Sequence, residues 1–413
     1  MRVEIITLEN GEQLPLLVDA DGLPVPSANE WLLTRRDRAA NTLTRNLSEL
    51  IPLFGWLERQ QFDLWERISS GKGFTEAEIR GSLLEYLRRA RNRRSVHRLS
   101  VAPDTYNKRL DTIADFLKSM FYTCLSHLPT DDNKYDRIQA NLDMMLSWFS
   151  SGRMSPEPAK RTAKGLETDE RDYLLRCLDP SKKGYDSYGK RMSRKTEASS
   201  ESYEVSQALR HRNYVMTVLM LFCGLRRGEL LSLRVDDVVT GSAIPQVNVI
   251  RRPPDPHDAR QPRPQVKRLS RVLPIAPYWA RPIDEYITEW RDVLLARSGN
   301  DTDYLMLARS GRPISLSQVD KIYRRIRDAH SDNLPSHLSP HALRHTFSQN
   351  VFTDLKAAGL TEEQVRRQVA LLRGDASEAS QDEYLRNEVA KQASSQLLRY
   401  QNSLSESFKD VPF

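Results

Sequence analysis

The N-terminal residues show the alternating pattern of a half-buried strand. Apolar and polar side chains alternate over residues 1–26, and Asn-Gly at 10–11 and Asp-Gly at 21–22 are strong turn signals. The pattern predicts a small β-hairpin arm, which we place at residues 1–28.

Helical spacing replaces this alternation further along the chain. Apolar residues recur every three or four positions within 43–57, 106–120 and 142–148. We therefore predict a helical domain over 29–150. The basic run LRRARNRRSVHR at 87–98 inside it is either a solvated helix face or a surface that contacts phosphates.

A polar segment interrupts the helical pattern and predicts a domain boundary. Residues 150–165 contain Gly, Pro, Ser and Lys without apolar periodicity, as linkers do. We place the linker at 151–166 and a second domain at 167–413. A further polar stretch at 179–202 predicts a mobile surface loop.

The second domain mixes buried and half-buried patterns. Residues 210–222 are apolar on every side, which indicates a buried helix. Segments 246–252 and 266–275 are β-like and flank a proline-rich excursion, and the chain from about 315 onwards is helical. The predicted fold class is mainly α with a small β-sheet (α+β).

Composition narrows the class of protein. A chain of 413 residues favours two or three domains, and a net charge of +7 favours a polyanionic partner, although an anionic membrane surface would attract it too. The three cysteines (Cys124, Cys177 and Cys223) lie too far apart for a metal or redox pair. The start is no signal peptide, and no run reaches the roughly 20 apolar residues of a membrane span. We therefore expect a cytoplasmic protein.

One candidate site residue follows the predicted buried helix. In CGLRRGELLSLRVDD (223–237), Gly224 suits the left-handed end of a helix, and Arg226 comes two residues later. An arginine anchored there can grip two oxygens of one phosphate with its planar guanidinium. Arg226 can equally form a simple pair with Glu229.

A second candidate lies in SPHALRH (339–345). Ser339 suits an N-cap and Pro340 the first helical position, so a helix begins here. His341 and Arg344 are three apart and are expected on one face of its first turns. An imidazole and a cation then lie near the positive end of the helix dipole, where anions bind.

A tyrosine downstream is the third candidate site residue, because of its place after these two segments. Tyr384 ends LLRGDASEASQDEY (371–384). Together and in this order, GLRRGEL, HALRH and Tyr384 resemble the tyrosine recombinase (phage integrase) family. The resemblance is strong over roughly 167–400 and weaker over 29–150.

The resemblance implies a role for each matched residue. Arg226 and Arg344 correspond to the two catalytic arginines, and His341 to the histidine of the second motif, suited to proton transfer at neutral pH. Tyr384 corresponds to the nucleophile.

The family also has a lysine on a β-hairpin between the two motifs. Lys267 fits this place best, with Arg263 and Arg268 as basic alternatives. Two departures stand out. Asp375 occupies the position that usually holds His or Trp, nine residues before the tyrosine, and the stretch between HALRH and Tyr384 is longer than usual.

The family's fold and chemistry are the further expectations. The fold is a two-domain DNA clamp with a helical core-binding domain and an integrase-type catalytic domain. The activity is site-specific recombination or integration through a 3′-phosphotyrosine, with no metal, ATP or other cofactor. The partners are double-stranded DNA, a homo-oligomer (a tetrameric synapse) and possible accessory recombinases, without a membrane.

The implied setting is a mobile genetic element, with the protein associated with the nucleoid. The main alternative is a DNA-binding accessory protein that kept the fold and lost cleavage, which Asp375 favours. A metal-dependent transposase or nuclease and a type IB topoisomerase are further alternatives.

Overall fold

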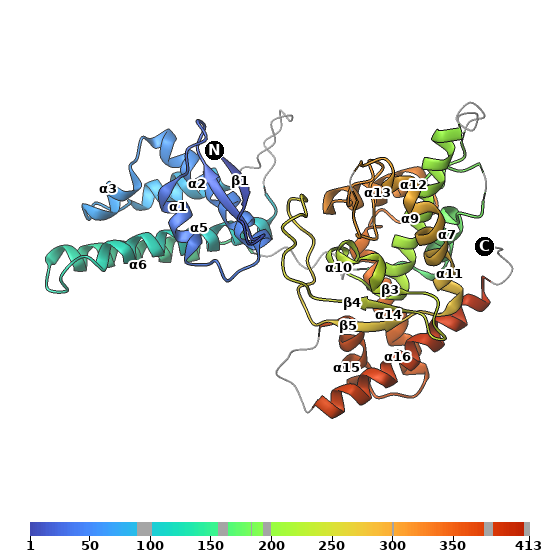
Figure 1. Ribbon diagram of the computed structural model, residues 1–413. Coiled ribbons are helices and arrows are strands. Elements are labelled where there is room, and N and C mark those ends of the chain that lie inside the picture. The colour runs from blue at the N-terminus through green and yellow to red at the C-terminus, as the bar shows by residue number, and fades with distance from the viewer. Residues whose placement is uncertain are drawn as a thin grey trace. The chain divides into compact units, whose positions relative to one another are not determined.

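The chain divides into two compact units, Met1–Lys160 and Arg161–Phe413 (Figure 1). Each unit has its own hydrophobic core. The boundary falls inside the segment 150–165. The structure is a computed structural model, and it describes residues 1–88, 101–155, 164–182, 184–192, 200–299, 301–375 and 383–408. Most of the basic run 87–98 lies outside these ranges.

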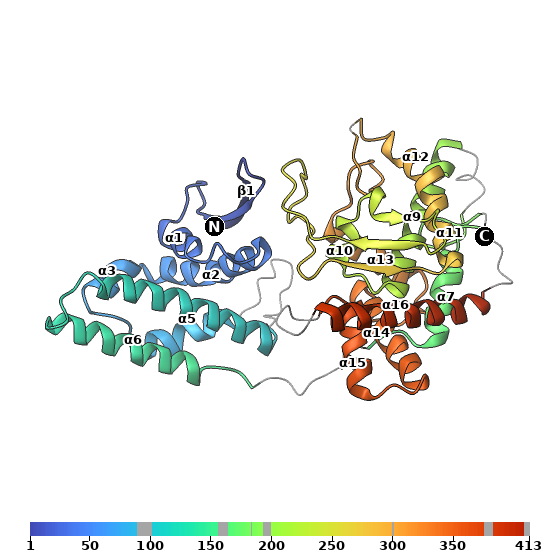
Figure 2. The ribbon, with the colours of Figure 1, turned by 60° about the horizontal axis from the view of Figure 1, so that its bottom comes forward.

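The N-terminal unit is a hairpin packed on helices. Strands β1 (Arg2–Thr7) and β2 (Gln13–Val18) pair antiparallel, which confirms the predicted hairpin. The helices that follow are α1 (Pro26–Leu33), α2 (Ala40–Gln60), α3 (Leu64–Ser69), the π-helical η1 (Ala77–Leu83), α4 (Leu84–Leu87), α5 (Pro103–Leu125) and α6 (Asn133–Ser151). Helices α5 and α6 lie side by side (Figure 2).

The hairpin shares the core of the helices. Leu17 is fully buried, and its backbone N–H donates to Asn29 Oδ1 at 2.8 Å while its carbonyl accepts from Asn29 Nδ2 at 3.0 Å. The Asn29 amide thus replaces a peptide group of a neighbouring strand. Trp31 of α1 packs edge-on against Phe116 of α5 at 5.6 Å between ring centres. Residues 1–28 therefore belong to the same compact unit as these helices.

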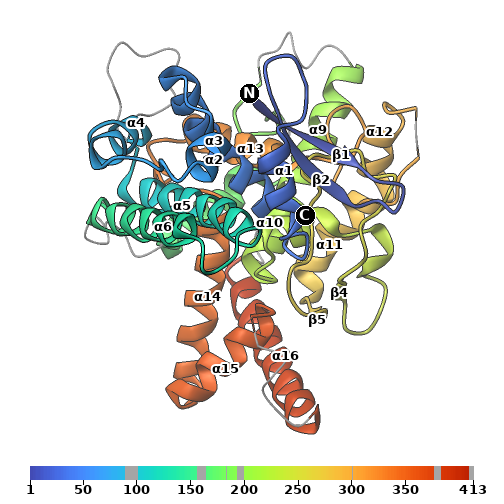
Figure 3. The same cartoon turned by 90° about the vertical axis from the view of Figure 1, so that its left-hand side faces the viewer.

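The C-terminal unit is helical around a small sheet. Its elements are α7 (Thr168–Leu178), α9 (Ser200–Phe222), α10 (Arg227–Ser232), η2 (Val235–Asp237), β3 (Val238–Val239), β4 (Gln246–Val249), β5 (Arg271–Pro274), α11 (Pro277–Glu285), η3 (Tyr286–Trp290), α12 (Arg291–Leu295), α13 (Leu316–Ala329), α14 (Pro340–Ala357), α15 (Glu362–Leu372) and α16 (Glu383–Glu406). The antiparallel sheet has the order β3-β4-β5. Helices α14, α15 and α16 pack on one another (Figure 3). The fold is mainly helical with small sheets, as predicted.

Helix α9 is the central helix of this unit. Its stretch 210–222 is buried throughout, as the sequence predicts. The buried Arg210 keeps its hydrogen bonds by donating to backbone carbonyls, including that of Lys182 at 2.8 Å. A buried polar group needs such partners, since leaving it unpaired is costly.

Three expectations about irregular segments were wrong. The strands are shorter than the segments 246–252 and 266–275, because the chain leaves the ladder after Val249 and rejoins it at Arg271. The described part of 179–202 is packed: the Ser187 carbonyl accepts from buried Asn213 at 2.6 Å. Its last residues belong to α9.

Within the described residues, no helix is long and apolar enough to cross a membrane.

Candidate active site

Arg226 is fixed by the turn that ends helix α9. Gly224 has φ +60°, and a Cβ there would lie 2.3 Å from the ring of Phe347 in α14. Only glycine suits that backbone at this close approach. Arg226 then caps α10: its N–H donates to Glu229 Oε2 and its Nη1 to Glu229 Oε1, both at 2.9 Å. The simple pair with Glu229 is therefore present.

Arg344 reaches the same turn from helix α14. Ser339 caps this helix by accepting from the Ala342 N–H at 3.3 Å, and Pro340 is its first residue, as predicted. Arg344 is 4% exposed and donates to the carbonyl of Gly224. Burial, and then the nearby Arg226, lower the pKa of Arg344 to about 9, so it stays charged at neutral pH.

Glu229 is the buried carboxylate that pairs with the arginines of the site. It is 1% exposed, and it accepts from Arg271 of strand β5 at 2.8 Å and pairs with Arg344 at 3.7 Å. Burial acts to raise the pKa of Glu229, but the hydrogen bond and charge of Arg271 outweigh it and hold this pKa below 4.5. The carboxylate is therefore ionised and sets the orientation of arginines from three separate segments.

Glu229→Gln is expected to lower the free energy of unfolding at pH 7 by about 3 kcal/mol, because buried arginines lose their counter-charge. Since the folded-state pKa lies below the ordinary 4.5, the ion-pair stabilisation is present above pH 4.5. It is lost as the pH falls through the folded-state value. Urea unfolding at pH 7 and pH 4 measures this loss. In the wild type, the free energy of unfolding should fall between these pH values in part because Glu229 begins to be protonated, and this part should be absent in the variant.

Glu362→Gln is the matched control, because Glu362 forms an exposed pair with Arg366. Its effect should stay below about 0.5 kcal/mol. Equal effects of the two substitutions would contradict the role of Glu229.

The end of helix α15 closes the cluster. Gly374 has φ +65°, and a Cβ there would meet Arg271 Nη1 at 2.6 Å. The turn directs the carbonyl of Arg373 inward, where it accepts from Arg226 at 3.0 Å and from Arg344 at 2.9 Å. Arg226, Arg344 and Asp375, which the sequence spreads over 150 positions, therefore meet at one place.

Asp375 lies within this arginine cluster. Its Oδ1 pairs with Arg226, and its Oδ2 pairs with Arg373 at 2.9 Å and with Arg344 at 3.4 Å. The Asp375 carboxylate thus contacts both Arg226 and Arg344. It does so at the surface of the cluster, since its side chain is 29% exposed.

His341 differs from Arg344 in its surroundings. Arg344 is turned into the protein, whereas His341 is exposed and shares a hydrogen bond of 2.9 Å between its Nε2 and that of His345. One ring must donate and the other accept, so the pair cannot carry two positive charges without breaking this bond. Burial, and then His341, lower the pKa of His345.

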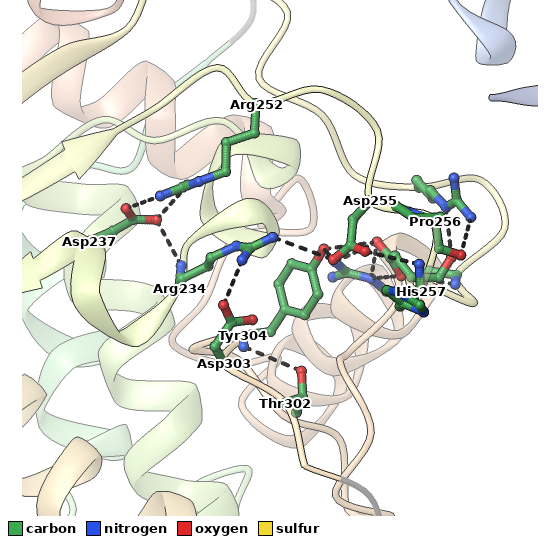
Figure 4. Close-up of polar contacts among 12 residues, drawn as sticks. Arg234, Asp237, Arg252, Asp255, Pro256, His257, Thr302, Asp303 and Tyr304 are labelled. Atoms are coloured by element: carbon green, nitrogen blue, oxygen red, sulfur yellow. Dashed lines mark hydrogen bonds and ion pairs between the residues drawn. The ribbon is translucent and has the colours of Figure 1, made fainter. Parts of the chain in front are cut away.

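The excursion that carries Lys267 is a folded element held by ion pairs. Figure 4 shows Arg252 paired with Asp237, and Arg234 and Tyr304 both reaching Asp255. These bonds attach the excursion to the start of the sheet and to the segment before α13.

The basic residues of the excursion differ in solvent exposure. Arg263 is buried and donates to the carbonyl of Asp258 at 2.6 Å, whereas Lys267 and Arg268 are exposed. The backbone just before Lys267 lies against helix α10, because a Cβ at Gly228 would be 2.9 Å from the carbonyl oxygen of Gln265. This contact brings the Lys267 segment to the helix that Arg226 caps.

The two downstream tyrosines have different places in helix α16. Tyr384 is in its first turn, and its side chain lies outside what the structure describes. Tyr400 is 6% exposed, accepts a hydrogen bond from Asn350 at 2.8 Å, and burial raises its pKa to about 12. Next to it, buried Gln401 donates to the carbonyl of Phe222, which fixes α16 on its own unit.

Sequence reasoning missed Arg271 and gave Glu229 too small a role. Glu229 was visible as the partner of Arg226 three residues away. Arg271 stands in a β-like segment close to Lys267 and Arg268, and only its hydrogen bonds to Glu229 and to the carbonyl of Leu372 distinguish it. Within the described residues, no group of three or more His, Cys, Asp or Glu side chains could hold a metal ion.

The comparisons with known proteins fit this site. Residues 194–355 match the model of the phage integrase family. The tyrosine recombinase XerC of Alcanivorax borkumensis is 25% identical over 268 residues, which cover 64% of this chain and 66% of that protein. XerC of Oceanobacillus iheyensis is 24% identical over 154 residues, 37% of this chain and 45% of that one. Over these stretches the chain is similar to the phage integrase, or tyrosine recombinase, family.

The chain also matches solved structures at low sequence identity. The XerA recombinase has a TM-score of 0.34 at 16% identity, over 93% of this chain and 99% of that one. A lambda integrase dimer bound to a core site has a TM-score of 0.46 at 13% identity, over 88% and 94%.

Proposed function

We propose that this chain is a site-specific DNA recombinase that cuts and rejoins DNA through a 3′-phosphotyrosine. One observation supports this proposal most: Arg226 and Arg344 lie far apart in the sequence, yet both pair with one small anionic group, the carboxylate of Asp375. A pair of guanidinium groups that holds two oxygens of one carboxylate also fits two oxygens of one phosphate.

The proposed reaction is an exchange of phosphate esters. The oxygen of Tyr384 attacks the phosphorus of a DNA phosphodiester, the bond to the 5′-oxygen breaks, and the 3′-phosphate stays on tyrosine. The cations of Arg226 and Arg344 stabilise the charge on the non-bridging oxygens. His341 takes the tyrosine proton, and Lys267 gives one to the leaving 5′-oxygen.

The energy of the broken bond is kept in the phosphotyrosine, so rejoining requires no ATP. A free tyrosine has a pKa near 10 and is a weak nucleophile, which is why the surrounding cations and proton acceptor are needed. In this proposal both units, Met1–Lys160 and Arg161–Phe413, bind double-stranded DNA, and the second one cuts it. Several copies, as in a tetrameric synapse, would act together.

The test is covalent trapping of DNA. The full chain is incubated with a pool of nicked duplexes of random sequence around the nick, from which a cleaved end diffuses away. We expect a protease-sensitive protein–DNA adduct that forms equally well in a metal chelator. Sequencing the trapped DNA then gives the target site.

An adduct lost in chelator would contradict the tyrosine mechanism and favour a metal-dependent nuclease. DNA binding without any adduct would favour the second candidate, an accessory protein that binds DNA without cleavage. Asp375 is the observation that supports this candidate, because a carboxylate beside a phosphate is repulsive.

DNA affinity is expected to depend steeply on salt, because lysines and arginines displace counterions from the phosphates. A plot of log affinity against log salt concentration should fall with a slope of about 0.9 per phosphate contact, several units in all. Electrophoretic mobility shifts at three or more salt concentrations measure it. A flat plot would show that this charge does not follow a DNA backbone.

A further inference from the structure

The carboxylate of Asp375 takes the place of a phosphate in the arginine cluster. One oxygen pairs with Arg226 and the other with Arg344 and Arg373, so each oxygen has its own guanidinium partner. Two non-bridging phosphate oxygens would bind in the same manner. The sequence alone does not indicate this contact, because 149 positions separate Asp375 from Arg226.

The other ligands of the two arginines are fixed. Glu229 is 1% exposed and is held by Arg271 at the same time. The carbonyls of Gly224 and Arg373 belong to the backbone of the two turns. Asp375 is the exposed ligand of the cluster, since nearly a third of its side chain faces solvent. It is therefore the group that an incoming anion can replace.

A phosphate and this carboxylate cannot share the position. Both are negative, and each needs the same face of Arg226 and Arg344. When a phosphate replaces the carboxylate, the arginines keep their hydrogen bonds, and Arg373 remains beside them as a partner for the displaced Asp375. The exchange leaves no buried charge unpaired, so it is a competition between two anions.

We propose that Asp375 is an internal competitor that holds Arg226 and Arg344 in the DNA-free protein and must leave before a phosphodiester binds. This inference rests on the proposed function, since it assigns the same two arginines to the phosphate. The competitor multiplies the affinity for any phosphate by the fraction of time that the site is free. Binding of a DNA phosphodiester then requires other contacts with the DNA that offset the displacement of Asp375.

The test compares two substitutions that remove one negative charge each. Asp375→Asn removes the competing charge, and Asp320→Asn removes the exposed partner of Arg227, the residue next to Arg226. Binding of inorganic phosphate to the full chain is measured by calorimetry. Asp375→Asn should bind phosphate about ten- to a hundredfold more tightly than the wild type. Asp320→Asn should differ less than threefold from the wild type.

Asp375→Ala serves as a second variant that cannot form an amide hydrogen bond, and it should also bind phosphate more tightly. Unchanged or weaker binding by both Asp375 variants, with thermal unfolding as in the wild type, would overturn the proposal. In that case Asp375 orients the arginines and does not compete. Equal gains in the Asp375 and Asp320 variants would overturn it too, because net charge alone would then explain them.

The trapping assay separates this outcome from failure of the proposed function. If the wild type forms the adduct and Asp375→Asn binds phosphate no more tightly, Asp375 is not a competitor, but the proposed recombinase function stands. Tighter phosphate binding by Asp375→Asn without an adduct in any variant keeps the competitor and rejects cleavage.

Discussion

Tyr384→Phe is expected to abolish covalent attachment to DNA, lowering the rate of adduct formation by more than about 10⁴-fold. The phenylalanine keeps the ring and removes only the oxygen that would attack phosphorus. DNA binding should remain within about twofold, because the substitution changes no charge. The measurements are adduct formation on the nicked duplex pool and mobility shifts on intact duplex.

Tyr400→Phe is the matched control on the same helix. Tyr400 is buried and bonded to Asn350, so its hydroxyl stabilises α16 and cannot reach DNA without undocking this helix. Loss of that hydrogen bond should cost about 1 kcal/mol of stability and leave the adduct intact. An adduct in Tyr384→Phe that disappears in Tyr400→Phe would reverse the assignment of the nucleophile.

Arg226→Lys is expected to slow adduct formation by about 10²- to 10³-fold under single-turnover conditions. Lysine keeps the charge but loses the planar fork that holds two oxygens at once. Arg226 is part-exposed and lies at a helix N-terminus, so the fold should tolerate the change. Urea unfolding should detect a loss of no more than about 1 kcal/mol.

Arg227→Lys provides the comparison from the neighbouring position. Arg227 forms an exposed pair with Asp320, and in the described part of the chain it forms no ion pair with Asp375. Its rate of adduct formation should stay within about threefold of the wild type. Similar losses at both positions would mean that general charge near the site, and not the geometry of Arg226, governs cleavage.

Together with the resemblance it carries, the sequence was sufficient to predict the local features of the site. Gly224 ends the buried helix, Ser339 and Pro340 start α14, and the stretch 210–222 is buried, because capping, backbone freedom and periodicity depend on a few neighbouring residues. The mainly helical class and the likeness to the phage integrase family also followed from such local patterns.

The same reasoning misjudged segments whose structure depends on distant contacts. The described part of 179–202 was expected to be mobile, yet Asn213 of α9 binds its Ser187. Charge and polarity in that stretch gave no sign of the contact. The excursion before β5 was expected to contain strand as far back as residue 266, but ion pairs such as Arg252–Asp237 hold it in an irregular path.

Only the tertiary structure decided how the charges of the site are paired. The sequence placed Asp375 nine residues before Tyr384 but did not show which cations its carboxylate would pair with. The tertiary structure pairs Asp375 with Arg226 and Arg344 as well as with Arg373, and it pairs Arg271 with Glu229. Local preferences act within a few residues and can be read along the chain. Ion pairs across 40 to 150 positions depend on which elements pack together, and in this protein that packing places a carboxylate where the arginines would hold a phosphate.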